Sequence, residues 1–342
     1  MKLKFWLNII TFVALIAIII FAWTDIIHAL EKITTLNIWV LLLIIPAQFF
    51  AFYSLGQVFH YFFKATGVAL TMKQLFAPML ELNFVNHVFP SGGASGFSYL
   101  TLRLKPYGVS PAKSTLAQLG RFVSTFLAFV GLMFVALFIL SLQGDVNPLV
   151  VFAVSSIAFT VLFSTAVLVF VVGRESRIDT FTKTLTMWIN RGIHIFRRKH
   201  PETISLRRVR TMFLELHEDY LVVRQNPKAM WPVMRWAVLT NLAEASLLYI
   251  AFMAHGELVN PGAVLIALVV ANLVGLVSIL PGGVGLYEPL MTAVLISGGI
   301  PAGLALSATL VYRVLSLLVS LITGYVLYHR ALNRYGSHDT AS

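Results

Sequence analysis

Length, composition and charge place this chain in a membrane before any motif is considered. Its 342 residues are 58% hydrophobic and only 11% charged, whereas a soluble domain carries about 25% charged residues. The net charge of +11 would suggest nucleic acid for a soluble domain, but on so apolar a chain it favours a membrane partner. The absence of cysteine excludes disulfides, thiolate metal sites and a cysteine nucleophile. The composition predicts an all-α polytopic membrane protein with one integral membrane domain over residues 1–342.

Six apolar runs are long enough to cross a bilayer, which needs about 20 mostly apolar residues per helix. They are residues 5–23, 38–63, 117–142, 149–172, 230–254 and 303–328. The first run is too long for a signal-peptide core and no small-residue cleavage site follows it, so we interpret it as a retained anchor. Two further apolar stretches, residues 75–102 and 264–297, are each interrupted by a Pro- and Gly-rich sequence.

Basic residues set the expected orientation, because cytoplasmic loops carry an excess of Lys and Arg. With a cytosolic N-terminus, 21 of the 25 basic residues fall on the cytosolic side, twelve of them within residues 174–228. We therefore expect a multi-pass protein of the cytoplasmic membrane with both termini in the cytosol. Within residues 174–228, apolar residues recur at helical spacing. This cytosolic basic segment is interpreted as two amphipathic helices that either lie along an anionic inner leaflet or pack on the bundle.

The two interrupted stretches resemble one another. The first contains Asn86, Pro90, Ser91, Gly92, Gly93 and Gly96, and the second contains Pro281, Gly282, Gly283, Gly285 and Glu288. Arg121 follows Pro90 by 31 residues, and Arg313 follows Pro281 by 32. The orientation makes equivalent elements run in opposite directions, which predicts an inverted-topology repeat with cores at residues 75–142 and 264–328. Six spans plus two re-entrant hairpins, or eight spans, are both compatible with this pattern.

Paired breaks of this kind point to a central transport site, because backbone freed from helices cannot face lipid and must be buried in protein or line a polar cavity. The alternative is a pair of Gly/Pro kinks that serve packing alone. Ionisable residues at membrane depth support a site, since each is costly unless paired or functional. Candidate pairs are Glu288 with Arg313 and Glu81 with Arg121, and Glu244 lies in the middle of its span. His87 and His60 are expected to be packed or interfacial residues rather than ligands.

No enzyme signature accompanies these breaks. The sequence has no His-Glu-x-x-His, nucleophile elbow, Walker motif or clustered carboxylates, so we expect no catalytic residues, no metal and no cofactor.

The motifs resemble the lysylphosphatidylglycerol synthase transmembrane-region family over roughly residues 5–330. The similarity lies in Asn-x-x-x-Pro-x-Gly-Gly and Pro-Gly-Gly-x-Gly-x-x-Glu, followed by Tyr312-Arg313 and Gly324. The family usually has an acidic pair around the first arginine. Here Arg121 has neither acid, and Glu81 is the expected substitute. The resemblance implies a lipid flippase that moves an aminoacylated or polyprenyl-linked lipid.

Under that hypothesis the two arginines attract the lipid phosphate, while Glu288 orients an arginine or meets a cationic group. The expected partners are membrane lipids with anionic headgroups, with a separate lipid-modifying enzyme as a further candidate and no nucleic acid. The alternative function is a non-transporting scaffold that recruits a lipid-modifying or glycosylating enzyme through residues 174–228. An intramembrane lipid-modifying enzyme is the third class. The candidate substrate-binding residues are Asn86, Pro90, Ser91, Gly92, Gly93, Gly96, Arg121, Glu244, Pro281, Gly282, Gly283, Gly285, Glu288 and Arg313.

Overall fold

A computed structural model describes residues 35–89, 94–142, 144, 146–196, 206–277 and 285–335, together with seven isolated positions before residue 35. Within this part of the chain every regular element is a helix. Five helical stretches are long and apolar enough to span a membrane: Ile38–Ala65, Pro111–Ser141, Pro148–Val172, Pro227–Ala254 and Ala302–Ala331. Five of the six predicted apolar runs therefore lie in helices of sufficient length and hydropathy to cross a bilayer. The sixth, the anchor predicted at residues 5–23, lies outside the described residues except for isolated positions.

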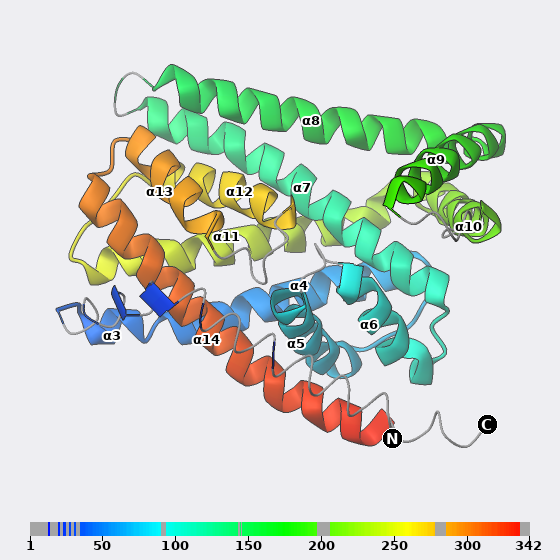
Figure 1. Ribbon diagram of the computed structural model, residues 1–342, viewed down its shortest axis with the longest axis horizontal. Helices are drawn as coiled ribbons and strands as arrows, with labels where there is room; N and C mark the ends of the chain where they lie inside the picture. The colour runs from blue at the N-terminus through cyan, green and yellow to red at the C-terminus, as the bar shows by residue number, and fades with distance from the viewer. Residues whose placement is uncertain are drawn as a thin grey trace.

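The helices follow one another in the order shown in Figure 1. They are α3 (Ile38–Leu41), α4 (Ile44–Ala65), α5 (Met72–Val88), α6 (Ala94–Leu104), η1 (Lys105–Tyr107), α7 (Pro111–Ser141), α8 (Pro148–Val172), α9 (Glu175–Phe196), α10 (Leu206–Gln225), η2 (Pro227–Met230), α11 (Trp231–Ala254), α12 (Pro261–Val277), α13 (Tyr287–Ser297) and α14 (Ala302–Tyr335).

Three of these helices begin with the same local chemistry, a proline preceded by a capping side chain. The Ser110 hydroxyl accepts the Lys113 N–H at the start of α7 (3.2 Å). The Asn147 and Asn260 side chains accept backbone N–H groups at the starts of α8 (2.9 Å) and α12 (2.7 Å). Proline fits the first helical turn because its missing N–H would have no helical acceptor there. The capping side chains accept hydrogen bonds from the other free backbone N–H groups of that turn, which lipid could not accept.

Both interrupted stretches form two helices each, as their Pro- and Gly-rich sequences predict. The first divides into α5 and α6, and the second into α12 and α13. The later member of each pair has 11 residues, which at 1.5 Å per residue is about 16 Å, roughly half of a 30 Å hydrocarbon core. The breaks themselves, residues 90–93 and 278–284, lie outside the described residues.

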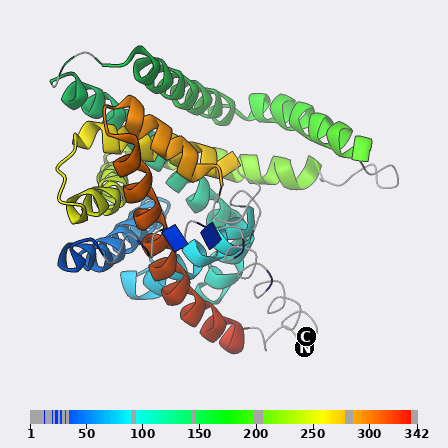
Figure 2. The same cartoon turned by 60° about the vertical axis from the view of Figure 1, so that its left-hand side comes forward.

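The packing interleaves the two ends of the chain. Helix α4 packs on α11, α5 packs on α14, and α7 packs on α12. In Figure 1 α14 runs from α13 across to α5. The largest buried core lies among α7, α11, α12, α13 and α14, and a second one joins α4, α5, α6, α7 and α11. Helices α9 and α10 lie at the C-terminal end of α8, on the far side of the molecule from α3 in both views (Figures 1 and 2).

The crossing of α5 and α14 depends on Gly324. A Cβ at this position would overlap the Phe84 side chain and lie 3.0 Å from the Leu80 carbonyl oxygen. We expect Gly324→Ala to lower the free energy of unfolding by about 1–3 kcal/mol, the usual cost of overpacking, as measured by unfolding of the purified protein in detergent. Gly131 is the matched control, because a Cβ there meets nothing within 4 Å. Equal losses in Gly324→Ala and Gly131→Ala would contradict the packing argument.

Candidate functional site

A buried ion pair joins α13 to α14. The Nε of Arg313 donates to Glu288 Oε1 at 2.9 Å, and the two side chains are only 9% and 7% exposed. The other carboxylate oxygen of Glu288 accepts the Gly285 N–H at 2.8 Å. Gly285 has φ +88°, a left-handed conformation that favours glycine. The Arg313 guanidinium also lies 4.1 Å from the centre of the Tyr287 ring. The predicted Glu288–Arg313 pair is confirmed.

The predicted pair of Glu81 with Arg121 is wrong. Glu81 Oε2 instead accepts hydrogen bonds from Arg103 Nε at 2.7 Å and from the Tyr99 hydroxyl at 2.6 Å. The reason is the geometry of the α5–α6 hairpin. Glu81 lies seven residues before the end of α5, and Tyr99 and Arg103 lie five and nine residues after the start of α6. Antiparallel helices therefore bring them opposite one another. Arg103, interpreted from sequence as a cytosolic topology signal, is mostly buried.

Arg121 has a different environment from Arg313. Its Nε atom is buried and has no hydrogen-bond partner among the described residues. Its acidic neighbour is Glu244 on α11, and their charges interact across the α7–α11 interface. Asn241, one turn before Glu244, donates to the Thr125 carbonyl on α7 at 3.1 Å and holds the two helices together beside Arg121.

Polar contacts connect the two arginines. The Glu244 carboxylate accepts a hydrogen bond from Asn272 Nδ2 at 3.3 Å. The side-chain oxygen Oδ1 of Asn272 in turn accepts a hydrogen bond from the Tyr287 hydroxyl at 3.0 Å, and Tyr287 lies against Arg313. We name these residues the central polar cluster: Arg121, Glu244, Asn272, Tyr287, Glu288 and Arg313. They come from α7, α11, α12, α13 and α14, so helices from both ends of the chain build one polar site inside an apolar bundle.

The end of α5 lies beside this cluster. Asn86 Oδ1 is buried without a partner among the described residues, and a Cβ at Gly96 on α6 would overlap it. His87 Nδ1 shares a hydrogen bond with the Asn83 carbonyl at 2.8 Å, and its ring interacts electrostatically with both Arg121 and Arg313. The predicted residues that the structure describes each contact or adjoin this polar region: Asn86, Gly96, Arg121, Glu244, Gly285, Glu288 and Arg313. Pro90, Ser91, Gly92, Gly93, Pro281, Gly282 and Gly283 lie outside the described residues.

Residues 6–324 match the family described as Lysylphosphatidylglycerol synthase TM region. The chain belongs to this family. Two relatives named UPF0104 membrane protein occur in Methanothermobacter thermautotrophicus. One is 42% identical over 80 residues, which cover 23% of this chain and 24% of the relative. The other is 23% identical over 256 residues, which cover 74% of each chain. A UPF0104 membrane protein of Pyrococcus horikoshii is 22% identical over 203 residues, covering 54% of this chain and 60% of the relative. The matched region contains all six residues of the central polar cluster.

Four residues of this TM-region protein make polar contacts that the sequence interpretation did not predict. Asn272 is the single strongly polar side chain in the apolar helix α12, and that isolation was the available signal. Tyr287 adjoins Glu288 but reads as an ordinary interfacial aromatic residue. For Tyr99 and Arg103 the sequence gave no sign of pairing with Glu81, because that pairing depends on how α6 folds back on α5.

Proposed function

We propose that this membrane protein moves the phosphate-bearing headgroup of a lipid across the bilayer through the central polar cluster. The observation that carries the proposal is the Nε donor of Arg121, which is buried in the interior of the bundle and has no acceptor among the described residues. A buried cation with an unsatisfied donor is costly in a membrane protein and marks a functional site by default. A phosphate oxygen would supply the missing acceptor in a charge-assisted hydrogen bond.

The two arginines differ in a way that suits a transient ligand. Arg313 is already matched by Glu288, so it serves as a fixed structural cation. Arg121 has Glu244 nearby, but its Nε makes no hydrogen bond to the described part of the chain. A phosphate can therefore bind Arg121 without first breaking an ion pair at close range. The neighbouring Glu244 repels an anion, which limits how tightly the headgroup binds and favours its release. We place the substrate at Arg121 and Glu244.

The packing pattern supports the inverted repeat that such a transporter requires. Suppose that α4–α7 correspond to α11–α14. Exchanging the two repeats then turns the α5–α14 contact into the α12–α7 contact and leaves the α4–α11 contact unchanged. The same exchange relates the α5–α6 and α12–α13 hairpins. Eleven-residue helices α6 and α13 favour re-entrant hairpins over full spans. Rocking of one repeat against the other would expose the cluster to each side in turn.

The transport proposal is tested with purified protein in liposomes that contain a headgroup-labelled phosphatidylglycerol. The fraction of label accessible to a membrane-impermeant quencher is followed over time. We expect the protein to bring the initially protected inner-leaflet label to the quencher, whereas protein-free liposomes retain that protected fraction. Equal protected fractions with and without protein, repeated with zwitterionic and aminoacylated lipids, would contradict a flippase function. The Arg121 variant that assigns the site is described in the Discussion.

The proposed orientation has a direct test, because the chain contains no native cysteine. Lys183 on α9 and Glu257 between α11 and α12 are both exposed. With the basic segment and both termini cytosolic, an impermeant maleimide applied to intact cells should label Glu257→Cys and not Lys183→Cys. Both should be labelled after the membrane is permeabilised. The reverse pattern in intact cells would overturn the orientation.

A further inference from the structure

An apolar groove of about 170 Å³ lies between α4, α7, α8, α10 and η2, and its lining contains none of the central polar cluster residues. Its walls include Phe62, Leu119, Val123, Val169, Leu216 and Tyr220. Apolar cavities of about 150 Å³ stay dry and bind hydrocarbon the size of benzene. The groove therefore has room for part of a hydrocarbon chain and little affinity for water.

The two aliphatic hydroxyls in the groove wall are satisfied within their own helices. Ser124 donates its hydroxyl to the Gly120 carbonyl at 2.7 Å, and Thr66 donates to the Phe62 carbonyl at 3.1 Å. Gly120 lets α7 approach α4 closely, since a Cβ there would overlap the Phe62 ring. These walls offer little to a ligand rich in hydrogen-bonding groups. The wall chemistry selects an apolar chain.

The groove opens onto the surface that faces lipid. Val169 lines the groove and is also 44% exposed. The next residue, Phe170, and Phe163 about two turns earlier are exposed on the same helix, and large apolar side chains exposed in series on a membrane helix face hydrocarbon. A lipid chain can therefore enter sideways from the bilayer without crossing a polar barrier.

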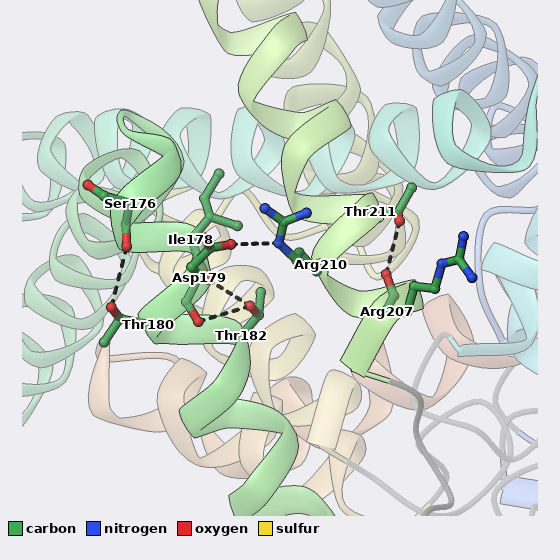
Figure 3. A network of polar contacts seen from close by, with 8 residues as sticks. All are labelled: Ser176, Ile178, Asp179, Thr180, Thr182, Arg207, Arg210 and Thr211. Atoms are coloured by element: carbon green, nitrogen blue, oxygen red, sulfur yellow. Dashed lines mark hydrogen bonds and ion pairs between the residues drawn. The ribbon is translucent and has the colours of Figure 1, made fainter.

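Helix α10 covers the groove and is held in place from two sides. Leu216 and Tyr220 contribute its side of the wall, and the intervening His217 ring hydrogen-bonds through Nδ1 to the Val172 carbonyl at the end of α8, at 2.6 Å. Farther along, Arg210 donates to Asp179 on α9 at 2.6 Å (Figure 3). This hydrogen bond lowers the pKa of the Asp179 carboxyl, but the pair is exposed and contributes little to stability. The groove is pre-formed.

Basic side chains flank the groove on four of its elements. Each lies within about one helical turn of a lining residue. They are Lys64 on α4, Lys113 on α7, Arg224 on α10 and Lys228 on η2. Glu215, Glu218 and Asp219 on α10 offset part of this charge, and burial together with Glu218 raises the pKa of the Glu215 carboxyl. The remaining excess is positive, which favours an anionic headgroup next to an apolar chain.

We propose that this groove binds one acyl chain of an anionic phospholipid, whose phosphate lies among these four basic side chains. Lysines and arginines at a membrane surface attract anionic lipid, and the apolar walls accept its tail. The site is a lipid-binding site at the α8–α10 end of the protein. It does not require that the protein transports lipid.

The test is photolabelling of the intact purified protein in lipid nanodiscs that contain phosphatidylglycerol with a mid-chain diazirine. Adducts are mapped by peptide mass spectrometry. We expect adducts on the groove-lining segments of α7, α8 and α10, at a yield roughly fivefold above that of phosphatidylcholine with the same chain. Adducts spread evenly over the lipid-facing helices, or equal yields from the two lipids, would overturn the proposal.

A matched pair of variants separates the groove from the general lipid surface. Val169→Trp fills the groove mouth, and Val167→Trp adds the same bulk two residues away on α8, at a similarly exposed position outside the lining. We expect Val169→Trp to lower groove adducts about tenfold, the effect of excluding roughly two methylene groups, and Val167→Trp to leave them unchanged. Arg121→Gln should also leave them unchanged, so loss of transport and loss of groove binding are distinguishable. Unchanged labelling in Val169→Trp would overturn the site.

Discussion

Replacing Arg121 with glutamine is expected to slow lipid transport in proteoliposomes by about 10- to 100-fold. A hydrogen bond to a charged group is worth about 1.5–3 kcal/mol, and each 1.4 kcal/mol is a factor of ten. Because Arg121 Nε has no partner among the described residues, the substitution removes none of their hydrogen bonds through that atom. It does remove the positive charge that faces Glu244, so transport is compared in folded protein whose unfolding temperature is measured alongside.

Two further variants make this result specific. Arg235→Gln removes an exposed arginine of α11, and its transport rate should match that of the wild-type protein. Arg121→Lys keeps the charge but loses the planar donor geometry, so its rate should fall between those of the wild-type protein and Arg121→Gln. Wild-type transport in folded Arg121→Gln would refute the assignment of the phosphate site.

The sequence was sufficient to predict features whose cause is local. Proline and glycine interrupt helices where they cluster, so the division of residues 75–102 and 264–297 could be predicted and agrees with α5–α6 and α12–α13. The Glu288–Arg313 pair was also predictable, because both residues lie in neighbouring helices of one unit and each would be costly alone at membrane depth.

Contacts that depend on how helices cross were beyond the sequence. The partner of Glu81 was misassigned because a carboxylate in α5 pairs with whichever cation the α5–α6 hairpin brings opposite it. Arg103 lies 22 residues from Glu81, and no sequence periodicity over that distance indicates that the two side chains meet. Glu244 and Asn272 meet only because α11 and α12 pack at that level. The assignment of Arg121 to a carboxylate of α11 likewise required the three-dimensional arrangement.

Removing either member of the buried Glu288–Arg313 pair is expected to lower the free energy of unfolding strongly. Removing one member of a buried ion pair costs about 3–5 kcal/mol, because the other charge is left without a partner. Glu288→Gln leaves the Arg313 guanidinium buried and weakens the acceptor for the Gly285 N–H. Arg313→Met leaves the Glu288 carboxylate without its cation. Each single variant should therefore lose about 3–5 kcal/mol of unfolding free energy in detergent.

The double variant distinguishes a structural pair from two independent sites. In Glu288→Gln combined with Arg313→Met no uncompensated charge remains, so its loss should be smaller than the sum of the two single losses by about 2 kcal/mol or more. The pair Arg210 and Asp179 provides a control at the surface, where exposed ion pairs contribute little. Additive losses at Glu288 and Arg313 would show that the two side chains do not stabilise the fold through one another. A non-additive result would separate the roles of the two arginines, since Arg313 would then support the architecture in which Arg121 is left to bind the lipid phosphate.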